Sequence, residues 1–334
     1  MRILILGGTA FLSAEIARQA LDAGHDVTCL ARGTAAEPPP GVRWVRADRS
    51  EGAGAYDGLD GGWDAVVDVS RDPAHARAAL AALGSRTGHW TFVSSCSVYD
   101  RHDQPGADEA AALLPSLPPG EEASPETYGE SKSAIEKLVL EAAGEKAHVV
   151  RAGLIGGPGD SSDRYGYWPA RFALGGETVL VPDIPGDPVQ VIDVRDLAAW
   201  ILSAAEGGVT GAFNAVGEVA LFGEYLDACR ELAGAAPGSV VPGSVTAGPG
   251  WLEAHGVQPW SGEDSLPLWL PPGHEGFMAR SNAAALARGL RLRPWRETLR
   301  DTLADERARG LQRPRKAGLR PETEKKLLAS LRLG

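Results

Sequence analysis

Short apolar runs alternate with helix-like segments through the first 150 residues. The runs predict strands over Arg2–Leu6, Asp26–Ala31, Val42–Arg46, Ala65–Val69, Trp90–Ser94 and His148–Ala152. Helices are predicted over Ala10–Ala23, Ala74–Leu83 and Ser124–Ala143, the last opened by Ser124 as a cap and Pro125 at the first helical position. Regular alternation of strand and helix is typical of an α/β fold, a doubly wound parallel sheet with helices on both faces.

The pattern changes after residue 152. Residues 153–188 and 234–273 are rich in Gly, Pro and aromatic residues, whereas 189–232 return to strand and helix and the chain after Ser281 is mostly helical and charged. A chain of 334 residues is long enough for two domains. We therefore expect an interleaved pair: a sheet domain from residues 1–152 plus about 189–233, and a smaller C-terminal domain from 153–188 plus about 234–334.

The composition excludes several classes of protein. Lys and Arg number 33 against 44 Asp and Glu, a net charge of −11, which argues against nucleic-acid binding because phosphate contacts need clustered basic residues. Three cysteines without metal-ligand spacing indicate a reduced, cytoplasmic protein with no metal site. The N-terminal apolar run is too short for a signal peptide or a membrane span, so we expect no membrane partner.

A glycine turn follows the first predicted strand. It joins that strand to a helix, the context in which N–H groups at a helix N-terminus bind a pyrophosphate. Gly7 keeps the first glycine of the dinucleotide-binding fingerprint, but Ala10 and Ser13 occupy the second and third places. A purely structural turn is the alternative. The candidate dinucleotide contacts here are Gly7, Thr9, Ala10, Phe11 and Leu12.

The end of the second strand indicates which dinucleotide binds. An NAD enzyme usually has Asp or Glu there, about 20 residues after the glycines, to hold the ribose 2′-hydroxyl. Here the segment from Cys29 to Gly33 has no carboxylate, and Arg32 is available for a 2′-phosphate, which favours NADP over NAD. Asp48 follows the third strand and is a candidate to accept from the adenine amine, or alternatively to cap the next turn.

Tyr128 and Lys132 lie four residues apart on the third predicted helix and therefore share one face. A nearby ammonium favours the phenolate and lowers the pKa of a tyrosine from about 10, which suits general acid–base work. Lys132 is the first of only six lysines, at a place where the bulkier, permanently charged Arg would not serve. Ser94 and Ser95 end the fifth strand, at the sheet edge where ligands bind in such folds.

The segments GGTAFL, FVSSCSVY and YGESK together resemble the short-chain dehydrogenase/reductase superfamily, and more narrowly its extended or atypical branch, which includes the NAD-dependent epimerase/dehydratase family. The resemblance is specific over residues 1–155 and continues weakly through 191–198. It implies a Rossmann-like fold, an NAD(P) cofactor and a catalytic set of Ser95, Tyr128 and Lys132, and it is compatible with a homodimer. The further cofactor contacts are Ser70, Ser94 and Lys132, at or beside the strand ends.

Two segments are candidates to contact or cover a substrate. Residues 101–124, between Ser95 and Tyr128, form a long loop that predicts a lid, with a disordered insertion as the alternative. After the sixth strand, arginines could pair with an anionic group and aromatics could stack on a small-molecule substrate. For the aromatics, packing in the core of the smaller domain is an equal alternative. These candidates are Arg164, Tyr167, Trp168 and Arg171.

We therefore expect an NADP-dependent oxidoreductase in which Ser95 orients the substrate oxygen, Tyr128 passes the proton, and Lys132 tunes Tyr128 and binds ribose. The first alternative is an epimerase or dehydratase that acts on a nucleotide-linked or phosphorylated sugar with recycled NAD(P). The second alternative is a non-catalytic nucleotide-binding regulator or an RNA-associated protein. The intact Ser-Tyr-Lys set and the net charge of −11 disfavour this last hypothesis.

Overall fold

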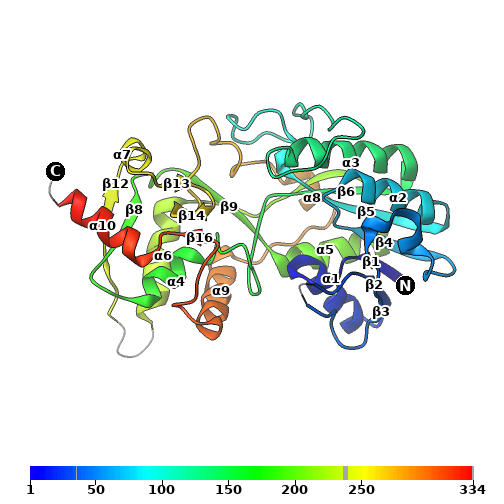
Figure 1. Cartoon of the computed structure of the whole chain (residues 1–334), viewed down its shortest axis with the longest axis horizontal. Coiled ribbons are helices and arrows are strands. Elements are labelled where there is room, and N and C mark those ends of the chain that lie inside the picture. Colours follow the sequence, from blue (N-terminus) through cyan, green and yellow to red (C-terminus); the bar gives the residue numbers. More distant parts are fainter. Residues whose placement is uncertain (35, 236–239, 333–334) are drawn as a thin grey trace. The chain divides into compact units, whose positions relative to one another are not determined.

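Seven parallel strands form one sheet in the order β3-β2-β1-β4-β5-β6-β10 (Figure 1). The computed structural model that shows this sheet describes residues 1–34, 36–235 and 240–332. The chain winds outward in both directions from β1 and β4, which confirms the predicted doubly wound α/β fold. The strands are β1 (Arg2–Leu6), β2 (Asp26–Leu30), β3 (Arg43–Val45), β4 (Trp63–Asp68), β5 (Thr87–Ser95), β6 (Ala147–Ala152) and β10 (Gly211–Ala215).

Helices cover both faces of this sheet. Helices α1 (Phe11–Asp22) and α5 (Val194–Gly207) pack together on one face, and α2 (Pro73–Leu83) and α3 (Tyr128–Ala143) on the other (Figure 1). Leu4 and Leu6 belong to the same apolar cluster as Leu80 of α2 and Ile135 of α3. Successive strand side chains point to opposite faces, so the sheet is apolar on both sides. Shorter helices are α8 (Ala283–Ala287), η1 (Arg49–Tyr56), η2 (Gly84–Arg86), η3 (Cys96–Val98) and η4 (Gly144–Lys146).

The described chain divides into two compact units. Unit 1, which holds the large sheet, comprises Met1–Gly153, Val194–Val216 and Arg280–Arg291, and unit 2 comprises Leu154–Asp193, Gly217–Ala279 and the residues from Leu292 onward. These bounds differ from the expected ones because the segments 189–193 and 217–233 lie in unit 2 and the segment Arg280–Arg291 lies in unit 1. There β11 (Val219–Leu221) pairs antiparallel with β9 (Pro188–Asp193), and α6 (Phe222–Gly234) packs against α4 (Tyr167–Leu174).

Unit 2 combines small sheets with helices around an aromatic core. Its fully buried large side chains include Trp168, Phe172, Phe222, Tyr225 and Trp269. One sheet has the order β11-β9-β7, and three further sheets are strand pairs, β12–β8, β13–β15 and β14–β16. The remaining elements are β7 (Leu154–Gly156), β8 (Thr178–Pro182), β12 (Gly243–Ala247), α7 (Pro249–Ala254), β13 (Gln258–Pro259), β14 (Gly262–Glu263), β15 (Ser265–Leu266), α9 (Trp295–Arg309), β16 (Ala317–Gly318) and α10 (Pro321–Leu331).

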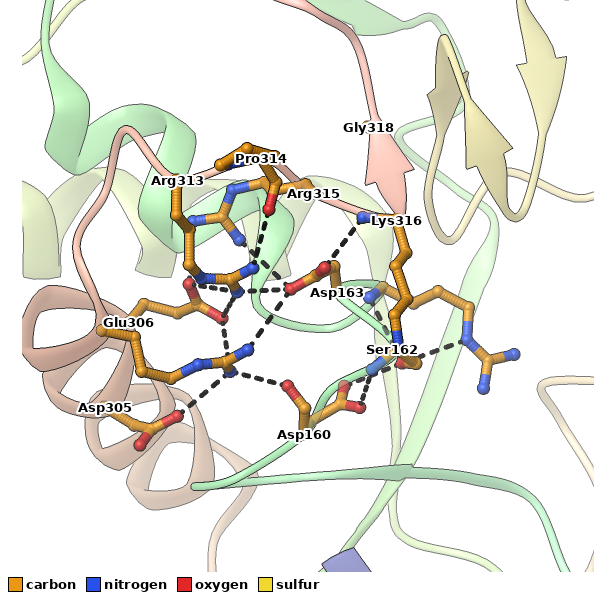
Figure 2. A network of polar contacts seen from close by, with 12 residues as sticks. Asp160, Ser162, Asp163, Asp305, Glu306, Arg313, Pro314, Arg315, Lys316 and Gly318 are labelled. Atoms are coloured by element: carbon orange, nitrogen blue, oxygen red, sulfur yellow. Dashed lines mark hydrogen bonds and ion pairs between the residues drawn. The ribbon is translucent and has the colours of Figure 1, made fainter. Parts of the chain in front are cut away.

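A buried ionic network ties the segment after α9 into unit 2 (Figure 2). Glu306 of α9 accepts hydrogen bonds from Arg313 at 2.9 Å and from Arg315 at 2.8 Å. Asp163 pairs with Arg313 and accepts the main-chain N–H of Lys316 at 2.8 Å. Burial opposes ionisation of Asp163, but these hydrogen bonds outweigh it and lower the pKa of Asp163. These two buried carboxylates therefore take charged partners from residues 313–316, in addition to Arg309 of α9.

The observed start of α3 corrects the predicted helix of 124–143. The helix begins at Tyr128, four residues later. Before it, the hydroxyl of Thr127 accepts the N–H of Ser124 at 2.9 Å, and the hydroxyl of Ser124 accepts the N–H of Thr127 at 3.3 Å. This reciprocal pair closes a turn ahead of the helix, because short polar side chains compete with helical hydrogen bonds. Tyr128 is therefore the first helical residue.

The loop of residues 101–124 is anchored to unit 1 and is not a disordered insertion. The N–H of Leu114 donates to the carbonyl of Val98 at 2.7 Å, and the N–H of Leu117 donates to the carbonyl of Glu130 at 3.0 Å. The hydroxyl of Ser133 on α3 donates to the carbonyl of Leu114 at 2.8 Å. These bonds fix the second half of the loop along the first two turns of α3.

Three general properties of the described residues bear on function. Among these residues, no helix combines the length and the apolar character that crossing a membrane requires. The described residues also contain no group of three or more His, Cys, Asp or Glu side chains suited to a metal ion. The three cysteines, Cys29, Cys96 and Cys229, are buried free thiols.

Two buried histidines lie side by side between the large sheet and α5. The rings of His89 and His148 are 5.7 Å apart, and the hydroxyl of Thr91 lies 3.4 Å from one and 3.2 Å from the other. His148 also packs edge-on against Trp200 of α5. Burial lowers the pKa of His148 to about 3, with a smaller contribution from His89, and burial lowers the pKa of His89 as well. Both imidazoles are therefore neutral in the folded chain near pH 7.

This pair predicts that stability falls in mild acid. The folded-state pKa values lie below the unfolded value of about 6.5, so the unfolded chain binds more protons below that pH. The contribution of the neutral histidines to the free energy of unfolding is therefore full above pH 6.5. Below that pH the free energy of unfolding falls by up to ~1.4 kcal/mol per pH unit for each histidine. His148→Gln removes one titrating ring and keeps a polar partner for Thr91. Urea unfolding between pH 7 and 4.5 should show a shallower pH slope for this variant, whereas the exposed His255→Gln should match the parent chain. If the free energy of unfolding had the same pH slope in the parent chain and in both variants, the prediction would be contradicted.

Candidate active site

The turn after β1 needs glycine at two successive positions. Gly7 and Gly8 have φ angles of +139° and +95°, in the region that side-chain-bearing residues rarely adopt. A Cβ atom at Gly8 would lie 2.2 Å from the sulfur of Cys29 on β2, and one at Gly7 would lie 3.0 Å from Val69. The turn is therefore packed tightly against the neighbouring strands, which brings the start of α1 to the carboxyl edge of the sheet.

The two departures from the glycine fingerprint are compatible with this turn. Ser13 is buried, and its hydroxyl donates to the carbonyl of Ala10 at 2.9 Å, so the extra side chain is accommodated within the first turn of α1. Ala10 itself is exposed, Thr9 and Phe11 are half-buried and Leu12 is buried. Within the described part of the chain, no side chain caps α1. The first N–H groups of this helix are therefore available to an anionic ligand.

Arg32 and Asp48 meet at the ends of β2 and β3. Their charged groups are 3.7 Å apart, and Asp48 also caps η1 by accepting the N–H of Ser50 at 2.9 Å. The bonds from Ser50, and the charge of Arg32, lower the pKa of Asp48. A second arginine is close by: Arg46 donates to the carbonyl of Arg32 at 3.2 Å and stacks on Trp44. Arg46 ends the third predicted strand, so its position beside Arg32 could have been inferred from the parallel order of the strands.

Glycine also sets the position of Tyr128. A Cβ atom at Gly129 would lie 2.4 Å from the carbonyl oxygen of Ser97, so the first turn of α3 touches the segment that follows β5. Tyr128 is half-buried at the start of this helix. One turn later, the ammonium of Lys132 lies 5.9 Å from the centre of the Tyr128 ring and 4.7 Å from that of Phe92. The structure thus brings Tyr128 and Lys132 together beside the end of β5.

Lys132 is buried, with 3% of its surface exposed. Its ammonium donates to the carbonyl of Ser70 at 2.6 Å and to the carbonyl of Val93 at 2.7 Å. These carbonyls lie just after β4 and near the end of β5. Burial lowers the pKa of Lys132 to about 7, while the charges of Asp68 and Glu136 act in the opposite direction.

The two serines at the end of β5 have different surroundings. Ser95 is half-buried; its hydroxyl accepts the N–H of Ser97 and donates to the Ser97 hydroxyl, both at 3.1 Å. Ser94 is 3% exposed, and its hydroxyl donates to Glu136 at 2.5 Å. Ser70 is likewise buried, with its hydroxyl donating to Asp68. The side chains of Ser94 and Ser70 are therefore bonded to protein carboxylates, and Ser95 is the one nearer the surface.

Four charged residues beneath this site were not singled out from the sequence. Asp68 of β4 pairs with Arg49 at 2.8 Å, and Glu136 of α3 pairs with Arg151 of β6 at 2.8 Å. Burial opposes ionisation of Asp68, but Arg49 and Ser70 lower its pKa overall. The spacing offered one signal, because Glu136 follows Lys132 by four residues and so shares its helix face. Asp68 and Arg151 occur in predicted strands where a charge requires a buried partner.

In unit 2, most of the expected substrate contacts pack within the protein. Tyr167 and Trp168 are in the apolar core, and the indole N–H of Trp168 donates to the carbonyl of Pro267 at 2.8 Å. Arg171 pairs with Glu324 at 2.7 Å and donates to the carbonyls of Gly175 and Thr178. Arg164 differs, since it is half-buried and stacks on the indole of Trp260 at 4.8 Å.

Comparison with solved structures finds this fold in enzymes that were solved with NAD. The UDP-glucose 4-epimerase of Thermus thermophilus, solved with NAD, superposes with a TM-score of 0.61 and 20% identity over 92% of this chain and 99% of that one. The dTDP-glucose 4,6-dehydratase of Bacillus anthracis, also with NAD, gives 0.66 and 14% over 98% and 99%. The enzyme WbmH of Bordetella bronchiseptica with NAD+ gives 0.64 and 20% over 92% and 99%.

The similarity to these solved structures shows that this chain shares their fold. No protein-family model matches the chain, and no curated protein matches its sequence. At 14–20% identity, the shared arrangement of sheet and helices is established, whereas activity has to be argued from the residues of this chain.

The contact at Gly129 generates a prediction with an unusual sign. Replacing a helical glycine by alanine ordinarily stabilises a protein by about 0.4–1 kcal/mol. Gly129→Ala should instead destabilise unit 1 by about 1–3 kcal/mol, because its methyl group would overlap the Ser97 carbonyl. Gly84→Ala is the matched control, since that position is helical and has open space around it. Chemical denaturation of both variants tests this, and stabilisation of Gly129→Ala would contradict the packing described.

Proposed function

We propose that the chain is an NAD(P)-dependent enzyme that uses Ser95, Tyr128 and Lys132, and that it is an NADP-dependent oxidoreductase. The observation that carries this proposal is the placement of Tyr128 and Lys132 on adjacent turns of α3 beside the ends of β4 and β5. In parallel α/β sheets, ligands bind at this edge. The uncapped start of α1 belongs to the same sheet edge.

The residues present fit a dinucleotide. The tight glycine turn places the start of α1 at the sheet edge, and the N–H groups there suit a pyrophosphate. The turn from Gly7 to Leu12, with Arg32 and Asp48, would hold the nucleotide, and Lys132 would hold its ribose. A nicotinamide nucleotide supplies hydride transfer when bound. Local positive charge is needed in a chain of net charge −11, and Arg32, Arg46 and Lys132 provide it.

The chain's own residues supply the acid–base chemistry. The hydroxyl of Ser95 would donate to the substrate oxygen and orient it. The phenol of Tyr128 would pass a proton to or from that oxygen, and the ammonium beside it favours the phenolate. In unit 2, Arg164 with its indole partner Trp260 remains a candidate contact for an anionic substrate.

Tyr128→Phe tests the catalytic assignment. Loss of the phenolic proton should lower kcat by about 10²–10⁴-fold, the usual contribution of a general acid or base. Nucleotide affinity should change little, because the phenol is assigned to the substrate oxygen. Steady-state kinetics and fluorescence titration with NADPH measure the two quantities. Full turnover by the variant would refute the role of Tyr128.

The choice of NADP depends on two arginines. Arg32→Ala and Arg46→Ala should each weaken NADPH binding by roughly tenfold or more, since a hydrogen bond to a charged group contributes about 1.5–3 kcal/mol. Binding of NADH should be unaffected by either change. Arg43→Ala removes an exposed arginine at the start of β3, three residues before Arg46, and serves as the control. Equal losses of affinity for NADPH and NADH would show that neither arginine binds the 2′-phosphate.

A second candidate is an epimerase or dehydratase that acts on a nucleotide-linked or phosphorylated sugar and recycles its nucleotide. The solved structures with this fold favour it, because they include UDP-glucose 4-epimerase and dTDP-glucose 4,6-dehydratase with NAD. The same Ser95, Tyr128 and Lys132 would serve. A nucleotide that remains bound through purification favours recycling, whereas one that exchanges freely with NADPH in solution favours net reduction.

A further inference from the structure

The position of the Lys132 ammonium depends on two main-chain carbonyls. Its hydrogen bonds to Ser70 O at 2.6 Å and Val93 O at 2.7 Å use two of its three donors. One carbonyl lies just beyond β4 and the other near the end of β5. Any movement of either strand end would therefore move the ammonium or break a hydrogen bond to a buried charge.

The first carbonyl is supported by the pair Asp68–Arg49. The carboxylate of Asp68 accepts both the N–H of Ser70 at 2.9 Å and its hydroxyl at 2.5 Å. Arg49 donates to the same oxygen, Oδ1, at 2.8 Å and to Oδ2 at 3.3 Å, and it also donates to the carbonyl of His75 at 2.9 Å. Asp68 is entirely buried. A continuous chain of polar contacts thus runs from Arg49 through Asp68 and Ser70 to Lys132.

The second carbonyl is supported by the pair Glu136–Arg151. Val93 precedes Ser94, whose hydroxyl donates to Glu136 at 2.5 Å. Arg151 donates to Glu136 at 2.8 Å and lies directly opposite Ser94 in the register of β5 and β6. Arg151 also donates to the hydroxyl of Tyr99 at 3.0 Å. Glu136, 1% exposed, therefore joins the helix that carries Lys132 to both strands beneath it.

We propose that Asp68 and Glu136, each held by its arginine, are positioning residues for Lys132. Each fixes one of the two strand ends whose carbonyls bind the ammonium, and each places a negative charge near it. This inference rests on the proposed function, in which Lys132 supports Tyr128. In this proposal, neither carboxylate takes part in the proton or hydride transfer itself.

The charges around Lys132 give the proposal a measurable consequence. They are Asp68 from β4, Arg71 from the segment after β4, and Glu136 from α3; the rings of Tyr128 and Phe92 also lie near the ammonium. Burial and Arg71 lower the pKa of Lys132, and the two carboxylates raise it. Removing either negative charge should lower that pKa further and leave more of the amine neutral at pH 7.

The scarcity of lysine makes the measurement direct. The chain has six lysines, so side-chain isotope labelling gives few NMR signals, and Lys132→Met identifies the signal of Lys132. In the parent chain this signal should titrate near pH 7. Glu136→Gln and Asp68→Asn should each move the midpoint down by roughly one pH unit. Glu141→Gln, an exposed glutamate on the same helix, should leave it unchanged.

Two further variants keep the test decisive if the single ones fail to fold. Ser94→Ala preserves the Glu136–Arg151 pair and removes only its link to β5; it should lower kcat at least tenfold with NADPH affinity within twofold. The double variant Glu136→Gln with Arg151→Met removes both charges and so avoids an unpaired buried arginine. In it, the Lys132 midpoint should also fall.

Three outcomes would overturn the inference: an unchanged Lys132 midpoint in folded Glu136→Gln or Asp68→Asn, an unchanged midpoint in the double variant, or normal turnover by Ser94→Ala. Failure of the proposed function looks different, because the parent chain would then neither bind nor turn over NAD(P). The NMR titration needs no nucleotide, so it tests the positioning role in either case.

Discussion

A parallel sheet covered on both faces ends at an edge where main-chain carbonyls need donors. Water satisfies them on an open surface, but a buried edge must supply its own partners. Here the ammonium of Lys132 bonds two such carbonyls, one beside β4 and one near the end of β5. The same side chain that satisfies the sheet is thereby placed against Tyr128. One side chain, Lys132, therefore both satisfies the carbonyls of the sheet edge and shapes the candidate site.

Much of this arrangement could be predicted from local sequence. The six expected strands of the first 152 residues all occur, and the turn from Gly7 occupies its expected place before α1. These features are local, since apolar runs, glycines and helix spacing act over a few residues. Tyr128 and Lys132 were assigned to one helix face for the same reason. Their roles remain predictions, although the structure brings them together.

What the sequence did not reveal depends on distant partners. The carbonyl partners of Lys132 are 62 and 39 residues away from it in the sequence, and no local sequence pattern predicts them. Arg171 has the chemistry of an anion-binding residue, but it pairs with Glu324, which is 153 residues further along. For both Lys132 and Arg171, tertiary contacts that the local sequence does not indicate bind the side chain.

The network around Asp163 and Glu306 has a consequence for the order in which the chain is made. Both carboxylates are buried, and their partners Arg313 and Arg315 come late in the sequence. Until residues 313–316 have emerged from the ribosome, closing this part of unit 2 would bury two charges without those partners, which is costly. The partners Arg309 and Arg313 follow Asp163 in the sequence by roughly 150 residues. The region around Asp163 and Glu306 can therefore complete its packing only after residues 309–316 have been synthesised.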